Sequence, residues 1–241
     1  MQRRDFLKIV GGGSLVAIAP SLIEGKLYAN DGTMFQSYNK VQLLDSKGEP
    51  LLASKLTIEE NYVFNYPHAG TSCLLIALPH ATDKDIKLKS ELDEEYLWKS
   101  GVGKNSHIVA YSAICPHQLT HINKEDAFLS YIPTNGKTMA CKKDSVIVCG
   151  SHLSAYEPSK GCKLIAGPAP QPLASIVLEH HDDDTLWAVA VLGPDKFHDF
   201  FKSFKPELKQ QYGGKRKAKK LVSDSTEVME LSNFTKDIIQ Y

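Results

Sequence analysis

Two pairs of cysteine and histidine are the residues of this chain whose types and spacing could bind metal. One residue separates Cys115 from His117, and two residues separate Cys149 from His152. Two thiolates and two imidazoles can close a tetrahedral zinc site. They can also bind a two-iron cluster, with both cysteines on one iron and both histidines on the other. The spacing alone leaves both kinds of site open, beside the possibility of four unrelated residues.

Each segment contributes one cysteine and one histidine, and this mixed arrangement differs from that of common zinc sites. Zinc fingers usually take paired cysteines from one turn and paired histidines from a helix. The mixed arrangement therefore favours the two-iron cluster. His121 is another imidazole near the first pair, but it lies outside the Cys-x-His spacing, and we interpret it as a surface residue.

The region resembles the cluster-binding part of Rieske [2Fe–2S] proteins. The first loop reads Cys-Pro-His-Gln-Leu from Cys115, and the second reads Cys-Gly-Ser-His-Leu-Ser-Ala-Tyr from Cys149. By this resemblance Cys115 and Cys149 ligate the inner iron of a Rieske-type cluster. His117 and His152 ligate the outer iron, with their imidazole edges facing solvent or a partner.

The residues after the second loop bear on the surroundings of such a cluster. Gly167 and Pro168 begin a Gly-Pro-Ala-Pro segment that resembles the loop with which the family covers its cluster. Ser154 and Tyr156 stand where high-potential members place hydroxyl groups aimed at a bridging sulfide and a cysteine sulfur. Such donors stabilise the more negative reduced state, so they raise the midpoint potential. The alternative for Tyr156 is a packed core aromatic.

The sequence departs from the quinol-oxidising Rieske proteins in one respect. Those proteins carry an additional cysteine in each loop, joined as a disulfide, and Thr120 and Ser151 stand at the corresponding positions here. Cys73, Cys141 and Cys162 are left over. They could be free thiols or could include a different bridge, and the sequence does not choose between these.

Short β-rich segments must position the loops. They cover residues 40–44, 51–56, 62–66, 73–78, 108–113, 175–180 and 186–192. Most are four to six residues long, which favours strands, and three aspartates between the last two predict a hairpin. Residues 83–99 are ambiguous between a surface helix and a loop, and 123–144 are expected to be a surface insertion.

The expected fold class is all-β. The resemblance implies the Rieske iron–sulfur fold, an antiparallel β-sandwich or barrel at residues 30–194, with an inserted cluster-binding subdomain at about 113–172. Residues 1–29 contain an Arg-Arg pair at Arg3 and Arg4 before a modestly apolar run, which resembles a twin-arginine export signal. A short amphipathic helix is the alternative. We expect a periplasmic protein whose signal is either removed or kept as a membrane tether.

Residues 195–241 are expected to be a C-terminal extension, helical and then basic. Four phenylalanines fall at helical spacing in a predicted helix over 195–212, and eight basic residues between Lys202 and Lys220 face the single acid Glu207. The phenylalanines are Phe197, Phe200, Phe201 and Phe204. Either they pack on the chain's own β-domain, or the extension docks on a partner subunit or an anionic membrane.

The resemblance implies an electron-transfer function, and the net charge bears on the choice of partner. The chain has 241 residues with 28 Lys+Arg and 28 Asp+Glu, and this zero net charge argues against a nucleic-acid partner. The exported part resembles the Rieske small subunit of arsenite oxidase. The resemblance implies one-electron transfer between a molybdopterin large subunit and a cytochrome-type acceptor, with no substrate site of its own. The alternatives are the Rieske subunit of a cytochrome bc-type quinol oxidase and, more remotely, a zinc-stabilised binding module.

Overall fold

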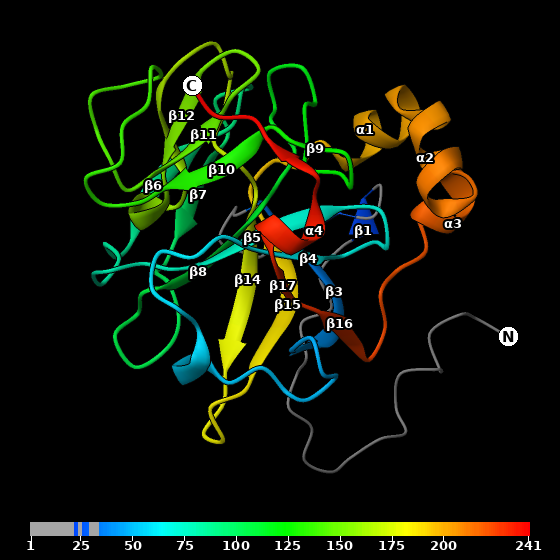
Figure 1. The fold of residues 1–241 in the computed structure, drawn as a ribbon, viewed down its shortest axis with the longest axis horizontal. Helices are drawn as coiled ribbons and strands as arrows, with labels where there is room; N and C mark the ends of the chain where they lie inside the picture. The colour runs from blue at the N-terminus through cyan, green and yellow to red at the C-terminus, as the bar shows by residue number, and fades with distance from the viewer. Residues whose placement is uncertain (1–21, 24–25, 29–33) are drawn as a thin grey trace, which may run out of the picture.

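The computed structural model describes residues 22–23, 26–28 and 34–241 (Figure 1). The expected export signal lies outside the described residues, apart from two short strands. None of the helices in the described residues is long and apolar enough to cross a membrane.

A ten-stranded sheet forms the body of the protein and curls into an almost closed, barrel-like shape. In hydrogen-bonding order its strands are β1 (Leu22–Ile23), β2 (Lys26–Tyr28), β3 (Met34–Leu44), β15 (Leu186–Leu192), β14 (Ser175–His180), β8 (Ile108–Ser112), β5 (Ser72–Ala77), β4 (Tyr62–Asn65) and β17 (Met229–Glu230). Strand β16 (Ser225–Glu227) pairs with β3 in parallel. The other pairings in this sheet are antiparallel.

A smaller antiparallel sheet forms the expected subdomain. Its strands are β10 (Leu129–Ile132), β11 (Val146–Cys149), β12 (Ser154–Glu157) and β13 (Lys163–Ala166). Two further pairs are β6 (Ile86–Lys89) with β7 (Glu95–Trp98), and β9 (Asp126–Ala127) with β18 (Asp237–Ile238). The all-β fold class with a separate subdomain is thus confirmed. The surface insertion expected at 123–144 is wrong in part, because β10 is buried along its whole length.

Strand β5 shows how the large sheet separates two cores. Successive side chains of a strand point to opposite faces. Accordingly, Cys73 and Leu75 belong to one core and Leu74 and Ile76 to the other, and all four are fully buried. The first core lies under the C-terminal helices. The second lies under the small sheet, so the large sheet holds the subdomain on one face.

The C-terminal extension packs on the chain's own β-domain. Its helices are α1 (Phe197–Ser203), α2 (Lys205–Tyr212), α3 (Lys215–Ala218) and α4 (Leu231–Phe234). Phe197, Phe200 and Phe201 are 1–3% exposed and belong to the first core. The single helix expected at 195–212 is interrupted at Phe204, because Pro206 occupies the first turn of a new helix. Beyond residue 220 the extension adds β16, β17 and β18.

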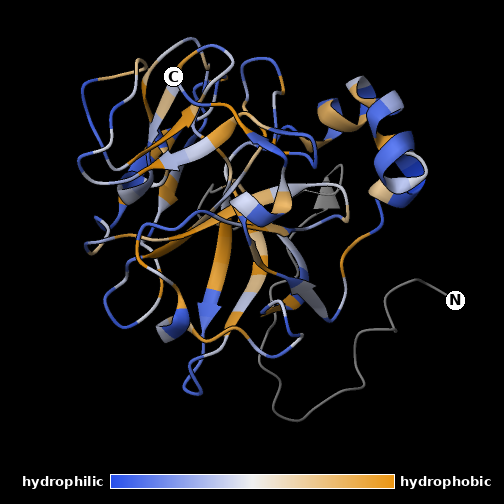
Figure 2. Ribbon diagram, in the orientation of Figure 1, coloured by the Kyte–Doolittle hydropathy of each residue, from blue (hydrophilic) through white to orange (hydrophobic). Residues whose placement is uncertain are grey.

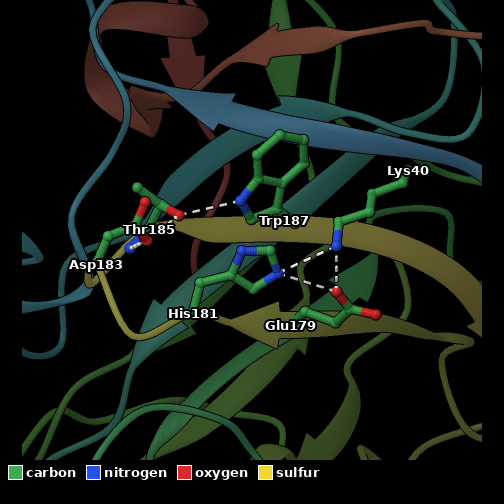
Figure 3. A network of polar contacts seen from close by, with 6 residues as sticks. All are labelled: Lys40, Glu179, His181, Asp183, Thr185 and Trp187. Atoms are coloured by element: carbon green, nitrogen blue, oxygen red, sulfur yellow. Dashed lines mark hydrogen bonds and ion pairs between the residues drawn. The ribbon is translucent and has the colours of Figure 1, made fainter.

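The hairpin of β14 and β15 matches the predicted residue ranges, and a polar network lies near its turn (Figure 3). Lys40 Nζ lies 2.7 Å from Glu179 Oε2 and 5.2 Å from the centroid of the Trp187 ring. Trp187 Nε1 donates to Thr185 Oγ1 at 3.0 Å. The hydrogen bond from Lys40 lowers the pKa of Glu179. These contacts hold β3 beside the end of the hairpin. The strand β14 itself is hydrophobic over most of its length, as Figure 2 shows.

Two other predicted segments differ from the structure. Residues 51–56 are not a strand but contain a 3-10 turn at Ala53–Lys55, and a second such turn lies at Pro158–Lys160. Residues 83–99 contain neither a helix nor only a loop, since they form the β6–β7 hairpin. Tyr96 and Trp98 on β7 are buried in the second core, which explains why the segment is held as a hairpin.

Candidate metal centre

The fold brings the two Cys-and-His loops face to face at one end of the small sheet. The first loop follows β8, and the second joins the end of β11 at Cys149 to the start of β12 at Ser154. The imidazole rings of His117 and His152 meet edge to face, with centroids 4.8 Å apart. The two loops, whose cysteine and histidine residues are at least 32 positions apart in the sequence, thus form one site.

The two cysteines lie inside the site and the two histidines lie toward its surface. Cys115 and Cys149 are each 1% exposed, His117 is half-buried and His152 is exposed. A hydrogen bond between the thiols lowers the pKa of Cys115 and raises that of Cys149. Both sulfurs would have to be deprotonated to bind a metal.

The two loops are built as matching turns around a leucine. In the first, the Leu119 N–H donates to the Cys115 carbonyl at 2.9 Å, and in the second the Leu153 N–H donates to the Cys149 carbonyl at 2.9 Å. Both leucines have left-handed φ angles, 61° and 60°. This conformation costs energy for a residue with a side chain, and it concentrates at functional sites. Sequence reasoning missed the leucines, since a glycine would have been the signal for such a turn.

Hydroxyl groups surround the Cys115 sulfur. The Tyr156 hydroxyl lies 3.3 Å from Cys115 Sγ, and both groups are buried. The Ser154 side chain, which is fully buried, helps to lower the pKa of Cys115, and its Oγ accepts the Ala169 N–H at 3.2 Å. Burial raises the pKa of Tyr156 far above its usual value, so its hydroxyl stays protonated and able to donate.

The Gly-Pro-Ala-Pro segment lies against the second loop. Gly167 has a left-handed φ of 88°, and a methyl group there would overlap Ser154 Cα and come within 2.6 Å of the Leu153 carbonyl oxygen. Only glycine allows this approach. Pro168 is exposed next to it, while Ala169 is buried beneath.

His121 is not the surface residue that the sequence suggested. It is 6% exposed, and its ring meets those of Phe200 and Phe204 at centroid distances of 4.7 Å each. Its Nδ1 lies 2.9 Å from the Leu119 carbonyl oxygen, and its Nε2 lies 2.7 Å from Glu207 Oε1. Both ring nitrogens of His121 thus contact oxygen acceptors of the protein.

The five cysteines form no disulfide, and all lie within the described residues. Cys73 and Cys162 are fully buried, and burial raises the pKa of each thiol. Cys141 is partly exposed. The choice left open by the sequence is therefore resolved in favour of free thiols at Cys73, Cys141 and Cys162.

The donor set fits a two-iron cluster. His117 Nδ1 is buried and has no hydrogen-bond partner in the described part of the chain, as expected for a nitrogen with another atom to bind. No three His, Cys, Asp or Glu side chains among the described residues converge on one ion-sized point. Two cysteines and two histidines are the donors that a Rieske cluster takes from its protein.

A family model and two known proteins are similar to this chain. Residues 81–177 match the family model of the Rieske [2Fe-2S] domain. The chain is 28% identical over 193 residues to the iodate reductase subunit IdrB of Denitromonas iodatirespirans, across 80% of this chain and 82% of that protein. It is also similar to the soluble domain of the Rieske protein II (soxF) from Sulfolobus acidocaldarius, with a TM-score of 0.45 and 21% identity over 64% of this chain and 78% of that one.

The matched segment contains both loops and the proline segment, whereas residues 195–241 lie outside it. The chain therefore contains a Rieske [2Fe–2S] domain, an electron-transfer domain whose cofactor is a Rieske-type [2Fe–2S] cluster.

Proposed function

We propose that this chain transfers single electrons as the Rieske small subunit of an exported molybdopterin oxidoreductase of the arsenite oxidase type. The convergence of two buried thiols with two surface-directed imidazoles carries the electron-transfer part of the proposal. The similarity to a subunit of an iodate reductase supports a place in an oxidoreductase complex. The Arg3–Arg4 signal supports export to the periplasm, and an uncleaved signal would also tether the protein to the membrane.

In this proposal Cys115 and Cys149 hold the inner iron, and His117 and His152 hold the outer iron. When bound, the cluster accepts and donates one electron at a time, and its neutral imidazole ligands place its potential above that of all-thiolate clusters. The chain keeps the sulfur side dry, because both cysteines are 1% exposed. The exposed His152 presents its ring where a redox partner can approach.

Tyr156→Phe and Ser154→Ala should each lower the midpoint potential of the centre by tens of millivolts. Tyr156→Phe removes a hydroxyl that lies 3.3 Å from Cys115 Sγ, and Ser154→Ala removes one that helps to lower the pKa of Cys115. Both hydroxyls are expected to stabilise added negative charge. One hydrogen bond of ~1 to 1.5 kcal/mol corresponds to roughly 45 to 65 mV for a single electron. A redox titration followed by circular dichroism or EPR measures the shift.

Tyr131→Phe is the matched control for this prediction. Tyr131 is equally buried and lies in the same small sheet, but its hydroxyl donates to Glu59 Oε1 at 2.9 Å. Its loss should leave the potential unchanged. Equal potentials in the Tyr156, Ser154 and parent proteins would show that these hydroxyls do not donate to the cluster sulfurs.

The basic face of the C-terminal helices is the surface we assign to the large subunit. Lys205 and Lys209 on α2 are exposed, and Figure 2 shows α2 and α3 mostly hydrophilic. Glu207, the single acid between Lys202 and Lys220, is turned toward His121, so it does not neutralise this face. A positive face next to the first loop fits an acidic partner, because complementary charge speeds encounter and fixes orientation.

Purification of the full-length tagged protein from its own periplasm tests the assignment. We expect molybdenum and a large subunit to copurify, and Lys205→Glu with Lys209→Glu to weaken the association roughly tenfold, more at low salt than at high salt. Lys47→Glu with Lys87→Glu, two exposed lysines on other elements, is the charge-matched control. Copurification of b- and c-type haem with quinol oxidation would favour the quinol-oxidase alternative. Recovery from the cytoplasm alone would contradict export.

A further inference from the structure

The two loops of the metal centre have no covalent link to each other. All five cysteines are free, and Thr120 and Ser151 stand where the quinol-oxidising proteins carry their bridge. The C-terminal extension, however, contacts both loops from outside. That these loops hold a cluster rests on the ligand set of the proposed function.

The extension reaches the first loop through His121. Leu119 forms the turn of that loop, and its carbonyl oxygen lies 2.9 Å from His121 Nδ1. The opposite nitrogen of the same ring lies 2.7 Å from Glu207 Oε1 on α2. Both contact atoms, a carbonyl oxygen and a carboxylate oxygen, are hydrogen-bond acceptors. Phe200 and Phe204 hold the ring from the sides.

The extension reaches the second loop at Gly150, the residue after Cys149. A methyl group at Gly150 would overlap the Ile239 carbonyl oxygen, so the extension runs directly over this position. The Ile239 N–H donates to the Ala127 carbonyl at 2.9 Å, and the Gly150 N–H donates to the Phe128 carbonyl at 2.7 Å. Neighbouring residues of one segment thus bind both the second loop and the extension.

Further contacts hold the last residues of the extension on the subdomain. β18 pairs with β9 in parallel, and Lys236 forms an ion pair with Glu125. Gln240 Nε2 donates to Ser130 Oγ at 2.8 Å, and the Tyr241 carbonyl accepts the Met139 N–H at 2.8 Å. This stretch is therefore fixed in place and does not merely lie near the loop.

Between its two contacts with the loops, the extension is bound to the large sheet. The Gly70 N–H donates to the Ala218 carbonyl at 2.9 Å, and the Val222 N–H donates to the Pro67 carbonyl at 3.0 Å. β16 then pairs with β3, and β17 pairs with β4. These bonds thus connect the extension, and through it both loops, to the large sheet.

We propose that residues 197–241 act as a noncovalent strap that positions both cluster loops, in place of a disulfide between them. Glu207, acting through His121, positions the first loop. Ile239, packed against Gly150, positions the second. These are positioning residues, because none of them is among the proposed iron ligands.

The test measures cluster loss from the full-length holoprotein in a chelator. Glu207→Ala and removal of residues 237–241 should each speed the loss roughly tenfold or more, as expected for losing a hydrogen bond to a charged group or several neutral ones. Glu207→Gln keeps an acceptor for His121 and should restore most of the lifetime. Asn233→Ala changes an exposed residue of α4 that bonds to Glu230 and should have no effect.

Gly150→Ala gives the sharpest arm of the experiment. The φ angle of Gly150 is not in the left-handed region, so alanine is unfavourable there because of Ile239. The substitution should speed cluster loss in the full chain and add little once residues 237–241 are removed. If Gly150→Ala speeds cluster loss equally in the full chain and in the chain without residues 237–241, the strap at the second loop is contradicted. If the cluster lasts as long in Glu207→Ala as in the parent protein, the strap at the first loop is contradicted.

Two measurements separate failure of the strap from failure of the ligand assignment. The EPR g values of the reduced centre should stay parental in every strap variant, since the ligands are untouched. In the cluster-free protein, amide exchange should rise in residues 115–121 for Glu207→Ala and in 149–154 for the shortened chain. Changed g values would instead place the altered residue among the ligands.

Discussion

Cys149→Ser and His117→Cys should each abolish the rhombic EPR signal that the reduced centre gives in the parent protein. Each variant alters one of four donors that the fold brings to a single site, with the cysteines buried and the imidazole centroids 4.8 Å apart. Exchanging imidazole for thiolate also adds negative charge to a site whose potential depends on neutral ligands. EPR and visible absorption of the purified, reduced protein measure the result.

Cys141→Ser and His121→Ala are the matched controls. Cys141 is a partly exposed thiol, and its loss should change nothing. His121→Ala should keep the g values, although the first loop loses its link to Glu207 and the cluster is released faster. Changed g values in the His121 variant, or survival of the signal in Cys149→Ser, would contradict the ligand set.

Removal of residues 195–241 should unfold the protein. The deletion takes three phenylalanines, Leu208 and Ala218 out of the first core, all of them at most 3% exposed. Replacing one buried phenylalanine by alanine costs about 3 to 5 kcal/mol. The total stability of a domain is only about 5 to 15 kcal/mol. Thermal denaturation followed by circular dichroism should therefore show no cooperative transition.

A shorter deletion of residues 237–241 is the control, since it spares the first core and should keep a cooperative transition. A soluble, cooperatively melting protein that ends at Pro194 would contradict this account of the core. Because the long deletion exposes the core, a docking role of the lysines has to be tested by charge reversal, which at single exposed sites changes stability by less than about 0.5 kcal/mol.

The site was predictable because its chemistry lies in short, contiguous segments. A few consecutive residues are enough to recognise each of its motifs, which are Cys-x-His, Cys-x-x-His and Gly-Pro-Ala-Pro. The same holds for the β14–β15 hairpin, whose apolar runs flank three aspartates. The contacts that support the site were not predictable. His121 contacts Glu207, which lies 86 positions away in the sequence, and no motif near either residue predicts this contact.

The segments that were assigned wrongly or missed also depend on contacts with residues far away in the sequence. Residues 51–56 are apolar because Leu51 and Leu56 enter the first core, and that core accepts a 3-10 turn as well as a strand. Strands β16 and β18 are two or three residues long and lie parallel to partners far away in sequence. Local propensity carries little information on such pairing, since tertiary packing decides it.

The late position of Ile239 in the chain sets an order of events during synthesis. Gly150 is translated 89 residues before Ile239, which at about 5 to 20 residues per second is an interval of roughly 4 to 18 s. During that interval both Cys-and-His loops already exist while the segment that covers Gly150 does not. The residue that covers Gly150 is therefore added to the chain after every other residue of the site.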